Sequence, residues 1–433
     1  MSEENKLIPQ LRFPEFVNEG EWDEKKLGDI AENVMYGMNS AAIEYDGENK
    51  YIRITDIDEN TRMFSPNPTS SPNGQLDDKY LLNKGDILFA RTGASVGKSY
   101  IHKTDEGKIY FAGFLIRFSI TGEVPYFVYA QTLTKQYQKW VTKTSMRSGQ
   151  PGINAEEYKL YPICLPPTIQ EQQKIASCLS SLDEVIAAHS QKLELLKEHK
   201  KGLMQNLFPQ EGEKVPNYRF KEFEKDGEWV EKSLIDTADK KVKWSFTGGP
   251  FGSNLKASDY TNEGIRIIQL QNIGDGEFND EYKIYTSEEK ADELLSCNIY
   301  TGEIIISKMG DPVGRTCIIP DNLKRCVMAS DGIRLVVNET KYSKYFVYSL
   351  INSKHIREAI ENKATGSTRK RIGLDELRNV KLIMPKSLTE QTKIASCLSS
   401  LDELITAQAE KIEQLKLHKK GLMQGLFPKT IMN

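Results

Sequence analysis

The residues most suggestive of chemistry form the stretch RTGASVGKS, in which glycines precede Lys98 and Ser99. A glycine-rich loop that ends in Gly-Lys-Ser/Thr and opens a helix can cradle phosphates, which would indicate a nucleotide-hydrolysing enzyme. The spacing does not fit such a loop, because three residues instead of four separate Gly93 from Gly97. The residues that follow, as in IYFAGFLIRFSI, are β-branched and aromatic and predict strands where a helix should begin.

A second copy of the loop argues more strongly against nucleotide binding. The sequence GDILFARTGASVGKS (residues 85–99) corresponds to GEIIISKMGDPVGRT (residues 302–316), where arginine replaces the lysine and Asp311 enters the loop. A carboxylate directed into a phosphate cradle would repel the ligand. We therefore interpret both stretches as hairpin tips and expect no nucleotide site in this chain.

Other enzyme and metal signatures are absent from the sequence. It has no Asn/Asp-Pro-Pro-aromatic motif of base methylation, no glycine-rich loop for S-adenosylmethionine, no GxSxG and no HExxH. Glu157 and Lys159 fit half of a nuclease pattern, but such triplets are common. The six cysteines form no CxxC pair and do not cluster with the five histidines, so no metal site is expected. These features predict a recognition and scaffold component without catalytic residues.

The composition is that of an ordinary soluble protein. With 433 residues, of which 39% are hydrophobic and 27% charged, the chain is long enough for two or three domains. No apolar run approaches the ~18 residues of a membrane-spanning helix, and the start, MSEENKLIPQ, lacks the apolar core of a signal peptide. We expect a cytoplasmic protein without membrane association. The net charge of −3 argues against uniform polyanion binding but is compatible with a DNA-binding face.

A long internal repeat supplies elements that could hold the two loops in place. Residues 171–209 and 390–428 agree at 29 of 39 positions at a constant offset of 219. Each copy opens on a capping-box pattern, Thr168-x-x-Glu171 or Ser387-x-x-Glu390, and continues with apolar residues at the spacing of a coiled-coil helix. The two apolar stripes would most simply pair with each other, antiparallel. The alternative is that each helix packs on its own domain.

The remainder of the two halves repeats more weakly but in the same order. IPQLRFPEF recurs as VPNYRFKEF, and IRITDI corresponds to IQLQNI. Strand-like stretches such as GDILFAR and GEIIISK, with helical stretches near PYFVYAQTLTKQYQKWV and KYFVYSLINSKHIREAIENK, predict α+β domains. The expected order is a first domain at 1–166, a central helical spacer at 167–209, a second domain at 210–385 and a distal helical spacer at 386–433, related by a pseudo-two-fold internal repeat.

This plan resembles the specificity subunit of type I restriction–modification systems. The resemblance covers essentially the whole chain and rests on the repeated EQxKIASCLSSLDExI and HKKGLMQxLFP, and on the P…EQ entry at 166–172 and 385–391. It implies two target recognition domains, each reading one half of a bipartite double-stranded DNA sequence, and helices that set the gap and dock two methyltransferase subunits. It also implies a chain without a catalytic site or cofactor of its own. S-adenosylmethionine for adenine methylation would belong to the partner methyltransferase, and ATP and Mg to a restriction and motor subunit.

The DNA-contacting residues cannot be carried over from the family, because the recognition domains differ widely among its members. Glycine-bearing tips that carry Arg, Lys, Ser, Asn or Gln suit base edges and phosphates. In the first domain the candidates are Arg91, Ser95, Lys98, Arg147, Ser148, Gln150 and Asn154. In the second domain they are Lys308, Arg315, Ser367, Thr368, Arg369, Lys370 and Arg371. The aromatics of KKVKWSFTGGPFGSNLK are a further candidate or belong to the core, and each basic loop could equally be solvated surface.

Charges that recur on both helices are candidates for partner contacts. The predicted partner-binding residues are Lys197, Lys200, Lys201, Lys416, Lys419 and Lys420, accompanied by the acids Asp183, Glu184, Asp402 and Glu403. A repeated surface fits two identical partners, although repeated charge is also typical of a solvated helix face. Two rival functions remain open: a self-sufficient nuclease or NTPase, and a coiled-coil scaffold without DNA recognition. The different loop sequences of the two domains favour an asymmetric DNA target.

Overall fold

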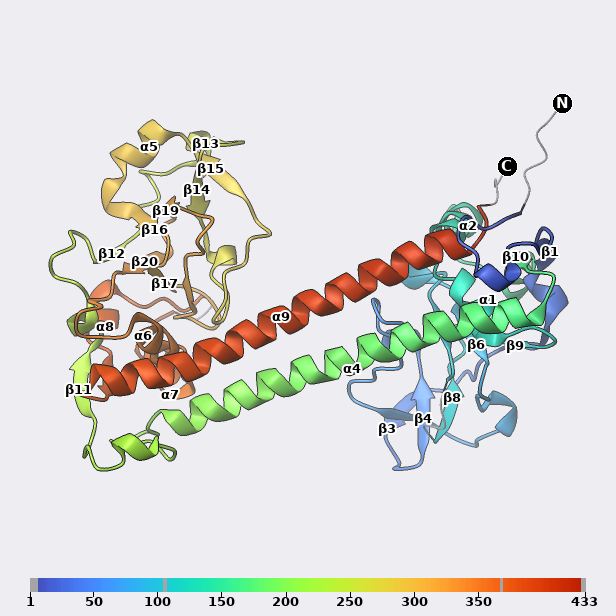
Figure 1. Cartoon of the computed structure of the whole chain (residues 1–433), viewed down its shortest axis with the longest axis horizontal. Coiled ribbons are helices and arrows are strands. Elements are labelled where there is room, and N and C mark those ends of the chain that lie inside the picture. Colours follow the sequence, from blue (N-terminus) through green and yellow to red (C-terminus); the bar gives the residue numbers. More distant parts are fainter. Residues whose placement is uncertain (1–6, 104–106, 367–368, 430–433) are drawn as a thin grey trace. The chain divides into compact units, whose positions relative to one another are not determined.

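A computed structural model of the chain describes residues 7–103, 107–366 and 369–429. The chain divides into two compact units. The first combines Met1–Ser190 with Glu410–Asn433, and the second comprises Gln191–Ala409. Each unit therefore contains one α+β domain and parts of both long helices, which are labelled in Figure 1.

The first domain is built around a four-stranded sheet with the order β2-β9-β6-β7, in which β6 pairs antiparallel with both neighbours. The predicted strands in DILFA and SYI are β6 and β7, so the glycine-rich stretch between them is a hairpin tip, as expected. The strands are β1 (Asp23–Lys26), β2 (Ala31–Tyr36), β3 (Ala42–Glu44), β4 (Asn49–Ile52), β5 (Ser70–Pro72), β6 (Ile87–Ala90), β7 (Ser99–Ile101), β8 (Lys108–Phe111), β9 (Leu115–Ile120) and β10 (Pro162–Leu165). The helices are α1 (Pro125–Gln131), α2 (Lys135–Ser145) and α3 (Ala155–Lys159).

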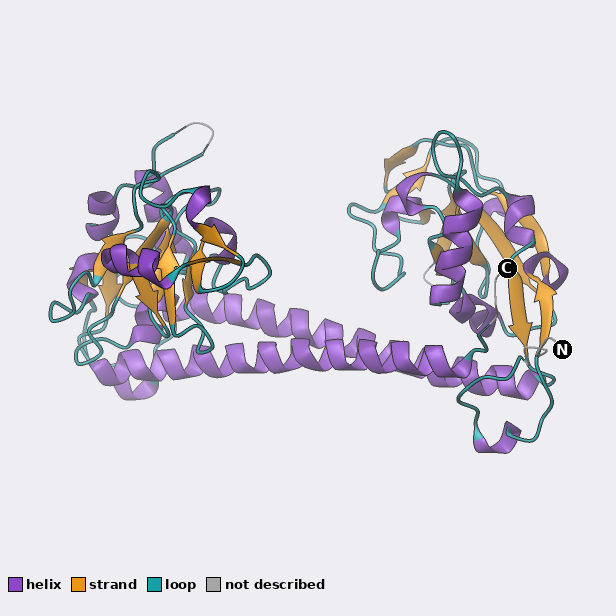
Figure 2. Cartoon of the chain, turned by 90° about the horizontal axis from the view of Figure 1, so that it is seen from above, coloured by secondary structure: helices purple, strands orange, loops and turns teal. Residues whose placement is uncertain are grey.

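The second domain repeats this sheet with the order β12-β20-β17-β18 and adds a five-stranded sheet, β13-β15-β14-β19-β16. In both units short helices lie against the strands and long loops extend from them (Figure 2). The strands are β11 (Val230–Ser233), β12 (Phe246–Gly248), β13 (Tyr260–Thr261), β14 (Ile265–Ile268), β15 (Ile284–Thr286), β16 (Asn298–Tyr300), β17 (Ile304–Ser307), β18 (Thr316–Ile318), β19 (Arg325–Met328), β20 (Gly332–Leu335) and β21 (Lys381–Met384). The helices are α5 (Glu288–Glu293), α6 (Lys344–Ile351), α7 (Lys354–Lys363) and α8 (Leu374–Arg378).

Each of the two predicted helical stretches contains two helices, α1 and α2 in the first domain and α6 and α7 in the second. In the first domain α1 ends at Gln131, and Thr134 caps α2 by accepting a hydrogen bond from the Tyr137 amide. In the second domain Asn352 and Ser353 separate α6 from α7. Polar residues that bond the local backbone compete with a continuous helix, and this explains both breaks.

The long helices are α4 (Ile169–Leu207) and α9 (Leu388–Leu426). In the first unit the start of α4 and the end of α9 share one core, which includes Ile175, Leu179 and Leu426. In the second unit the end of α4 and the start of α9 do the same, with Leu207 and Leu398 fully covered. The start of one helix thus accompanies the end of the other in each unit, which confirms the antiparallel pairing. The start of each helix also packs on the domain that precedes it, so the two expected arrangements coexist.

The capping-box prediction at the helix starts is wrong for the carboxylates. Glu171 is 0% exposed, and its two oxygens accept hydrogen bonds of 2.8 Å from Nε and Nη2 of Arg12. In the second unit Arg219 holds Glu390 in the same way, at 2.7 and 2.8 Å. A bidentate guanidinium is a stronger partner for a buried carboxylate than a helix amide, so the arginines of the repeated RF motif bind these groups.

Within the described residues, no helix is long and apolar enough to cross a membrane.

Candidate nucleic-acid interface

Two loops that are distant in the sequence meet at one edge of the first domain's sheet. Thr92 and Gly152 form a β-bridge, and the Ile153 amide donates to the Arg91 carbonyl at 2.9 Å. The Gly93 amide donates to the Pro151 carbonyl at 3.0 Å. The hairpin tip after β6 and the loop before α3 therefore form one continuous surface. Most of the residues proposed from the sequence for this domain lie on these two loops.

Arg91 is the best placed cation of this surface. Its guanidinium carbon lies 5.0 Å from the ring centre of Tyr36 and 5.7 Å from that of Phe114. Nε of Arg91 is buried and has no hydrogen-bond partner among the described residues. The Phe114 side chain is 58% exposed. Stacked between two rings, the guanidinium is held in place while its remaining donors stay available for a base edge or a phosphate.

The second domain reproduces this arrangement with other side chains. Met309 and Arg371 form the equivalent β-bridge, and the Ile372 amide donates to the Lys308 carbonyl at 2.9 Å. The Lys308 amide donates to the Asp331 carbonyl at 2.8 Å, just as the Arg91 amide donates to Phe114 at 3.1 Å. Lys308 in the second domain is therefore structurally equivalent to Arg91 in the first, and Asp331 is equivalent to Phe114. The two domains present different chemistry from the same framework.

Cations are crowded at this edge of the second domain. Burial lowers the pKa of Lys308, and the charge of Arg371 lowers it further, while Asp331 acts in the opposite direction. The Arg371 side chain is 56% exposed and its Nη2 lies 3.8 Å from Asp331 Oδ1. An anion bound between Lys308 and Arg371 would relieve their repulsion. Phosphate oxygens of a nucleic acid are anions of this kind.

The structure corrects two of the predicted contact residues, Lys98 and Arg315. Lys98 is only 5% exposed, donates from Nζ to the Ile57 carbonyl at 2.9 Å and forms an ion pair with Glu59. Arg315 is partly buried, and its Nη2 lies 3.4 Å from the Leu270 carbonyl. Both cations hold backbone carbonyls of equivalent short turns inside their own domains. Lys98 therefore has a structural role and is not available to DNA, and Arg315 is primarily structural.

The other candidates of the first domain differ in availability. Ser148 and Gln150 are exposed, and Ser95 is partly buried in the short turn of Gly93–Ser95. Arg147 is exposed but pairs with Glu157 and donates to the Thr144 carbonyl at 2.8 Å. The Asn154 side chain accepts from the Glu157 amide at 2.9 Å and so caps α3. Asn154 has a structural role in this arrangement, whereas Ser148 and Gln150 are free to turn towards a ligand.

In the second domain, Ser367 and Thr368 lie outside the described residues. Arg369 is exposed, and so is Lys370, which pairs with Glu361 at 2.6 Å. Of the aromatics in the segment 240–256, Phe246 belongs to the core, whereas Trp244 is 38% exposed beneath Lys243.

Sequence reasoning missed the neighbours that shape the two edges. Tyr36 and Phe114 in the first domain, and Asp331 in the second, are not among the contact residues predicted from the sequence. Tyr36 is followed by a glycine that has no room for a side chain. A Cβ on Gly37 would lie 2.3 Å from the Ala112 carbonyl oxygen. Gly249, at the matching place after β12, would put a Cβ 1.8 Å from the Ala329 carbonyl. The two glycines let the chain pass tightly under the loop that carries Phe114 or Asp331.

The six lysines on the long helices fall into two groups. Lys419 pairs with Asp183, and Lys200 pairs with Asp402 at 2.5 Å, so these two join α4 to α9 within their units. They are corrected from partner-binding to structural residues, because their charges are already neutralised. The remaining four are exposed: Lys197, Lys201, Lys416 and Lys420. Over residues 7–103, 107–366 and 369–429, no cluster of His, Cys, Asp or Glu could hold a metal ion.

Comparison with known proteins agrees with the repeated architecture. The family described as "Type I restriction modification DNA specificity domain" matches residues 19–198 and 255–417. The type I restriction enzyme MjaVIII specificity subunit of Methanocaldococcus jannaschii is 23% identical over 436 residues, which span 98% of this chain and 95% of that protein.

Two solved structures share the fold. The S subunit of the type I restriction–modification system of M. genitalium gives a TM-score of 0.61 at 16% identity, over 98% of this chain and all of that one. A chain from another solved type I R-M system gives 0.53 at 16% identity, over 95% of this chain and 98% of that one. With the family match over most of its length, the chain belongs to the family of type I restriction–modification DNA specificity subunits.

Proposed function

We propose that each domain reads one half of a bipartite, gapped and asymmetric DNA sequence with the sheet edge described above. In the first domain the reading surface consists of Arg91, Ser148 and Gln150, flanked by Tyr36 and Phe114. In the second it consists of Lys308 and the cations Arg369 to Arg371. Arginine and glutamine can form bidentate hydrogen bonds to guanine and adenine edges, and lysine suits guanine or phosphate.

One observation carries this proposal: the same backbone framework presents different side chains in the two domains. Arg91 and Lys308 occupy equivalent places, with Phe114 opposite the first and Asp331 opposite the second. A surface that only had to hold phosphates would have no reason to change from an aromatic neighbour to an acidic one. A carboxylate beside the duplex would accept from a cytosine amino group, so Asp331 favours base reading at its own position, whereas the neighbouring Lys308 and Arg371 suit phosphates.

The proposed role of the long helices is to set the gap between half-sites and to dock two methyltransferase subunits. The exposed lysines Lys197 and Lys201 in α4, and Lys416 and Lys420 in α9, recur at equivalent positions and suit two identical partners. This chain would act without a catalytic site. S-adenosylmethionine would be bound by the methyltransferase, and ATP and Mg by the restriction subunit. We further propose that the complex works in the cytoplasm, where its DNA target lies.

Selection from randomised DNA tests the proposed function. The chain, co-purified with the methyltransferase subunit of its own system, is mixed with duplexes that carry two random blocks at varied spacing. The expected result is enrichment of one asymmetric motif with a fixed gap. A coiled-coil scaffold would enrich no motif. A self-sufficient enzyme would cleave the DNA or hydrolyse ATP without any partner.

A further inference from the structure

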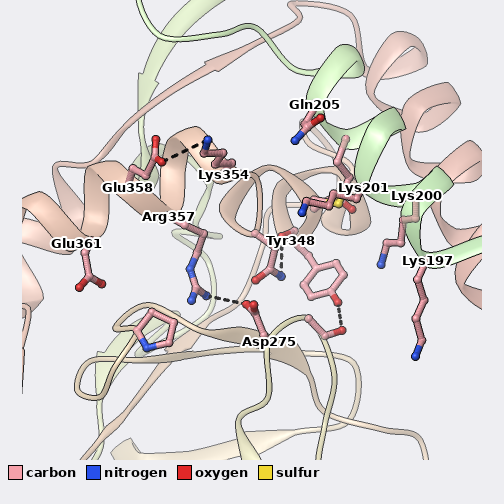
Figure 3. Close-up of a pocket in the computed structure, with 15 residues that line it drawn as sticks. Lys197, Lys200, Lys201, Gln205, Asp275, Tyr348, Lys354, Arg357, Glu358 and Glu361 are labelled. Carbon is pink, nitrogen blue, oxygen red and sulfur yellow. Dashed lines mark hydrogen bonds and ion pairs between the residues drawn. The ribbon is translucent and has the colours of Figure 1, made fainter. Parts of the chain in front are cut away.

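A cavity in the second unit adjoins the proposed reading edge, because Glu361 in its lining pairs with Lys370, but none of the proposed reading residues lines it. It has a volume of about 520 Å³ and is bounded by the end of α4, by α6 and α7, and by the loops at Asp275 and Pro312. Figure 3 shows Lys197, Lys200 and Lys201 on one wall, and Arg357 and Lys354 on the other. A volume of this size lies in the range of ligand-binding pockets, about 300–1,000 Å³.

The acids around the cavity already have partners on their own side. Asp275 lies 3.4 Å from Arg357, and Glu358 lies 3.9 Å from Lys354, as the dashed lines of Figure 3 mark. Glu361 pairs with Lys370 at 2.6 Å. The α7 wall is therefore close to neutral and offers little charge to a ligand.

The wall formed by α4 is different, because positive charge remains there. Lys200 is neutralised by Asp402 at 2.5 Å, and Lys197 has the exposed neighbour Glu194 at 2.9 Å. Exposed pairs of the latter kind contribute about 0–1 kcal/mol and exchange readily. For Lys201, which is exposed, the described part of the chain contains no ion pair. Lys201, assisted by Lys197, is thus the group that an acidic ligand would meet.

The floor of the cavity is apolar. It includes Met204, Pro312 and the ring of Tyr348, whose hydroxyl donates to the Gly276 carbonyl. A DNA backbone would bring phosphates over this floor and leave it uncovered. A protein segment with an apolar face and acidic side chains along one edge would cover the floor and pair with Lys201 and Lys197 at once. Methionine adapts its shape to such partners more easily than branched side chains do.

We infer that this cavity receives an acidic, amphipathic segment of one methyltransferase subunit. The inference rests on the proposed function, which supplies the partner. It goes beyond that function by placing one docking contact in the second unit and by giving the chemistry of the segment. In the first unit the counterpart of Met204 is Met423, which is 8% exposed within the core, whereas Met204 is partly buried at the edge of the second unit's core. The two partner copies are therefore expected to dock unequally.

Charge reversal at Lys201 tests the inference in the complete chain. Wild type and Lys201→Glu are each mixed with the methyltransferase subunit of the same system, and stoichiometry and affinity are measured by native mass spectrometry and calorimetry. We expect wild type to bind two copies, and the variant to bind its second copy about tenfold or more weakly. Lys201→Arg should behave as wild type. Lys192→Glu, an exposed charge change on the same helix away from the cavity, is the matched control.

DNA binding by the same variants separates the outcomes. Lys201→Glu should keep the affinity of the chain for its selected duplex. Two bound copies with unchanged affinities in Lys201→Glu would overturn the inference. So would a loss of DNA affinity with normal docking, because the cavity would then serve the DNA backbone. If wild type binds no methyltransferase at all, the failure lies in the proposed partner function itself.

Discussion

Lys419, near the end of α9, forms an ion pair with Asp183 of α4, although 236 positions separate them in the sequence. Their side chains are only 14% and 25% exposed. Asp183 also accepts a hydrogen bond from the Tyr126 hydroxyl at 2.5 Å, so helix, partner helix and domain meet at one carboxylate. In the second unit Lys200 and Asp402 repeat the relationship at 2.5 Å. The lysines that the sequence suggested for partner contacts thus include two that join the helices.

Removing the Lys419 charge is expected to destabilise the first unit. Lys419→Met should lower the free energy of unfolding, measured by urea denaturation, by about 1.5–3 kcal/mol. The reason is that Asp183 loses a charge-assisted hydrogen bond while remaining partly buried. The double variant with Asp183→Asn should cost less than the sum of the two single changes. Lys416→Met is the matched control, since Lys416 has only the exposed neighbour Glu413. Equal costs for Lys419→Met and Lys416→Met would contradict the structural role.

The same carboxylate predicts an acid dependence of stability. Burial raises the pKa of Asp183, but Lys419 and Lys103 more than offset this, so its pKa in the folded chain lies below the ordinary value of 3.8. A carboxyl group whose pKa is lower in the folded chain stabilises the fold at pH values above its pKa in the unfolded chain. This contribution is lost as the pH falls through the pKa of the folded chain. Between about pH 5 and about pH 3, wild type should therefore lose more stability than Asp183→Asn. Parallel curves for the two proteins would show that Asp183 is not the titrating group.

Substitutions of Lys98 and Arg91 should have opposite effects: the first should lower stability, and the second should change DNA selection. Lys98→Met should lower the melting temperature, because the Ile54 and Ile57 carbonyls lose a donor at 3.4 and 2.9 Å. At permissive temperature its DNA motif should be unchanged. Arg91→Ala should leave the melting temperature nearly unchanged and relax selection at one base pair, at about 1–3 kcal/mol for a lost bidentate contact. Selection and calorimetry on both variants check this, and a changed motif in Lys98→Met would restore that residue to the reading surface.

The buried pair of Arg12 and Glu171 should contribute more to the free energy of unfolding than the pair of Lys419 and Asp183. Their side chains are 6% and 1% exposed, and removal of one member leaves a buried charge without its partner. Glu171→Gln is expected to cost about 3–5 kcal/mol in chemical denaturation. Glu15→Gln serves for comparison, because Glu15 is exposed and only 3.2 Å from the equally exposed Lys174. A cost below about 1 kcal/mol for Glu171→Gln would place this pair with ordinary surface ion pairs.

The sequence predicted the architecture well, because repeats and helical periodicity are local signals. The 29 identities between the two helical segments required one element to occur twice, and alternation in DILFA and EIIIS marked the central strands. The carboxylates of the capping boxes were assigned wrongly for the opposite reason, whereas the Ser387 hydroxyl does accept from the Glu390 amide at 3.4 Å. Thr168 and Glu171 are neighbours in sequence, whereas Arg12, which takes the carboxylate, lies 159 positions away. A local sequence pattern cannot show that a residue far away in the sequence will bind a side chain more strongly than the nearby backbone does.

The candidate site was predicted in part. Glycines and cations marked two loops in each domain, and the structure brings these loops together, but the sequence could not show that Thr92 pairs with Gly152. Lys98 and Arg91 looked alike in sequence, seven residues apart on one hairpin tip. They differ only because one side chain turns inward to backbone carbonyls and the other outward between two rings. Side-chain direction in an irregular tip depends on tertiary contacts, and composition does not determine it.

Exchange of one domain, read out by methylation mapping, tests the central claim most directly. Residues 210–385 are replaced by the equivalent domain of a related specificity subunit, and the chimera is co-expressed with the methyltransferase of its system. Sequencing of modified adenines should give a motif in which one half-site is new, while the other half-site and the gap are those of wild type. If both half-sites change, or if neither changes, the two domains do not read DNA independently.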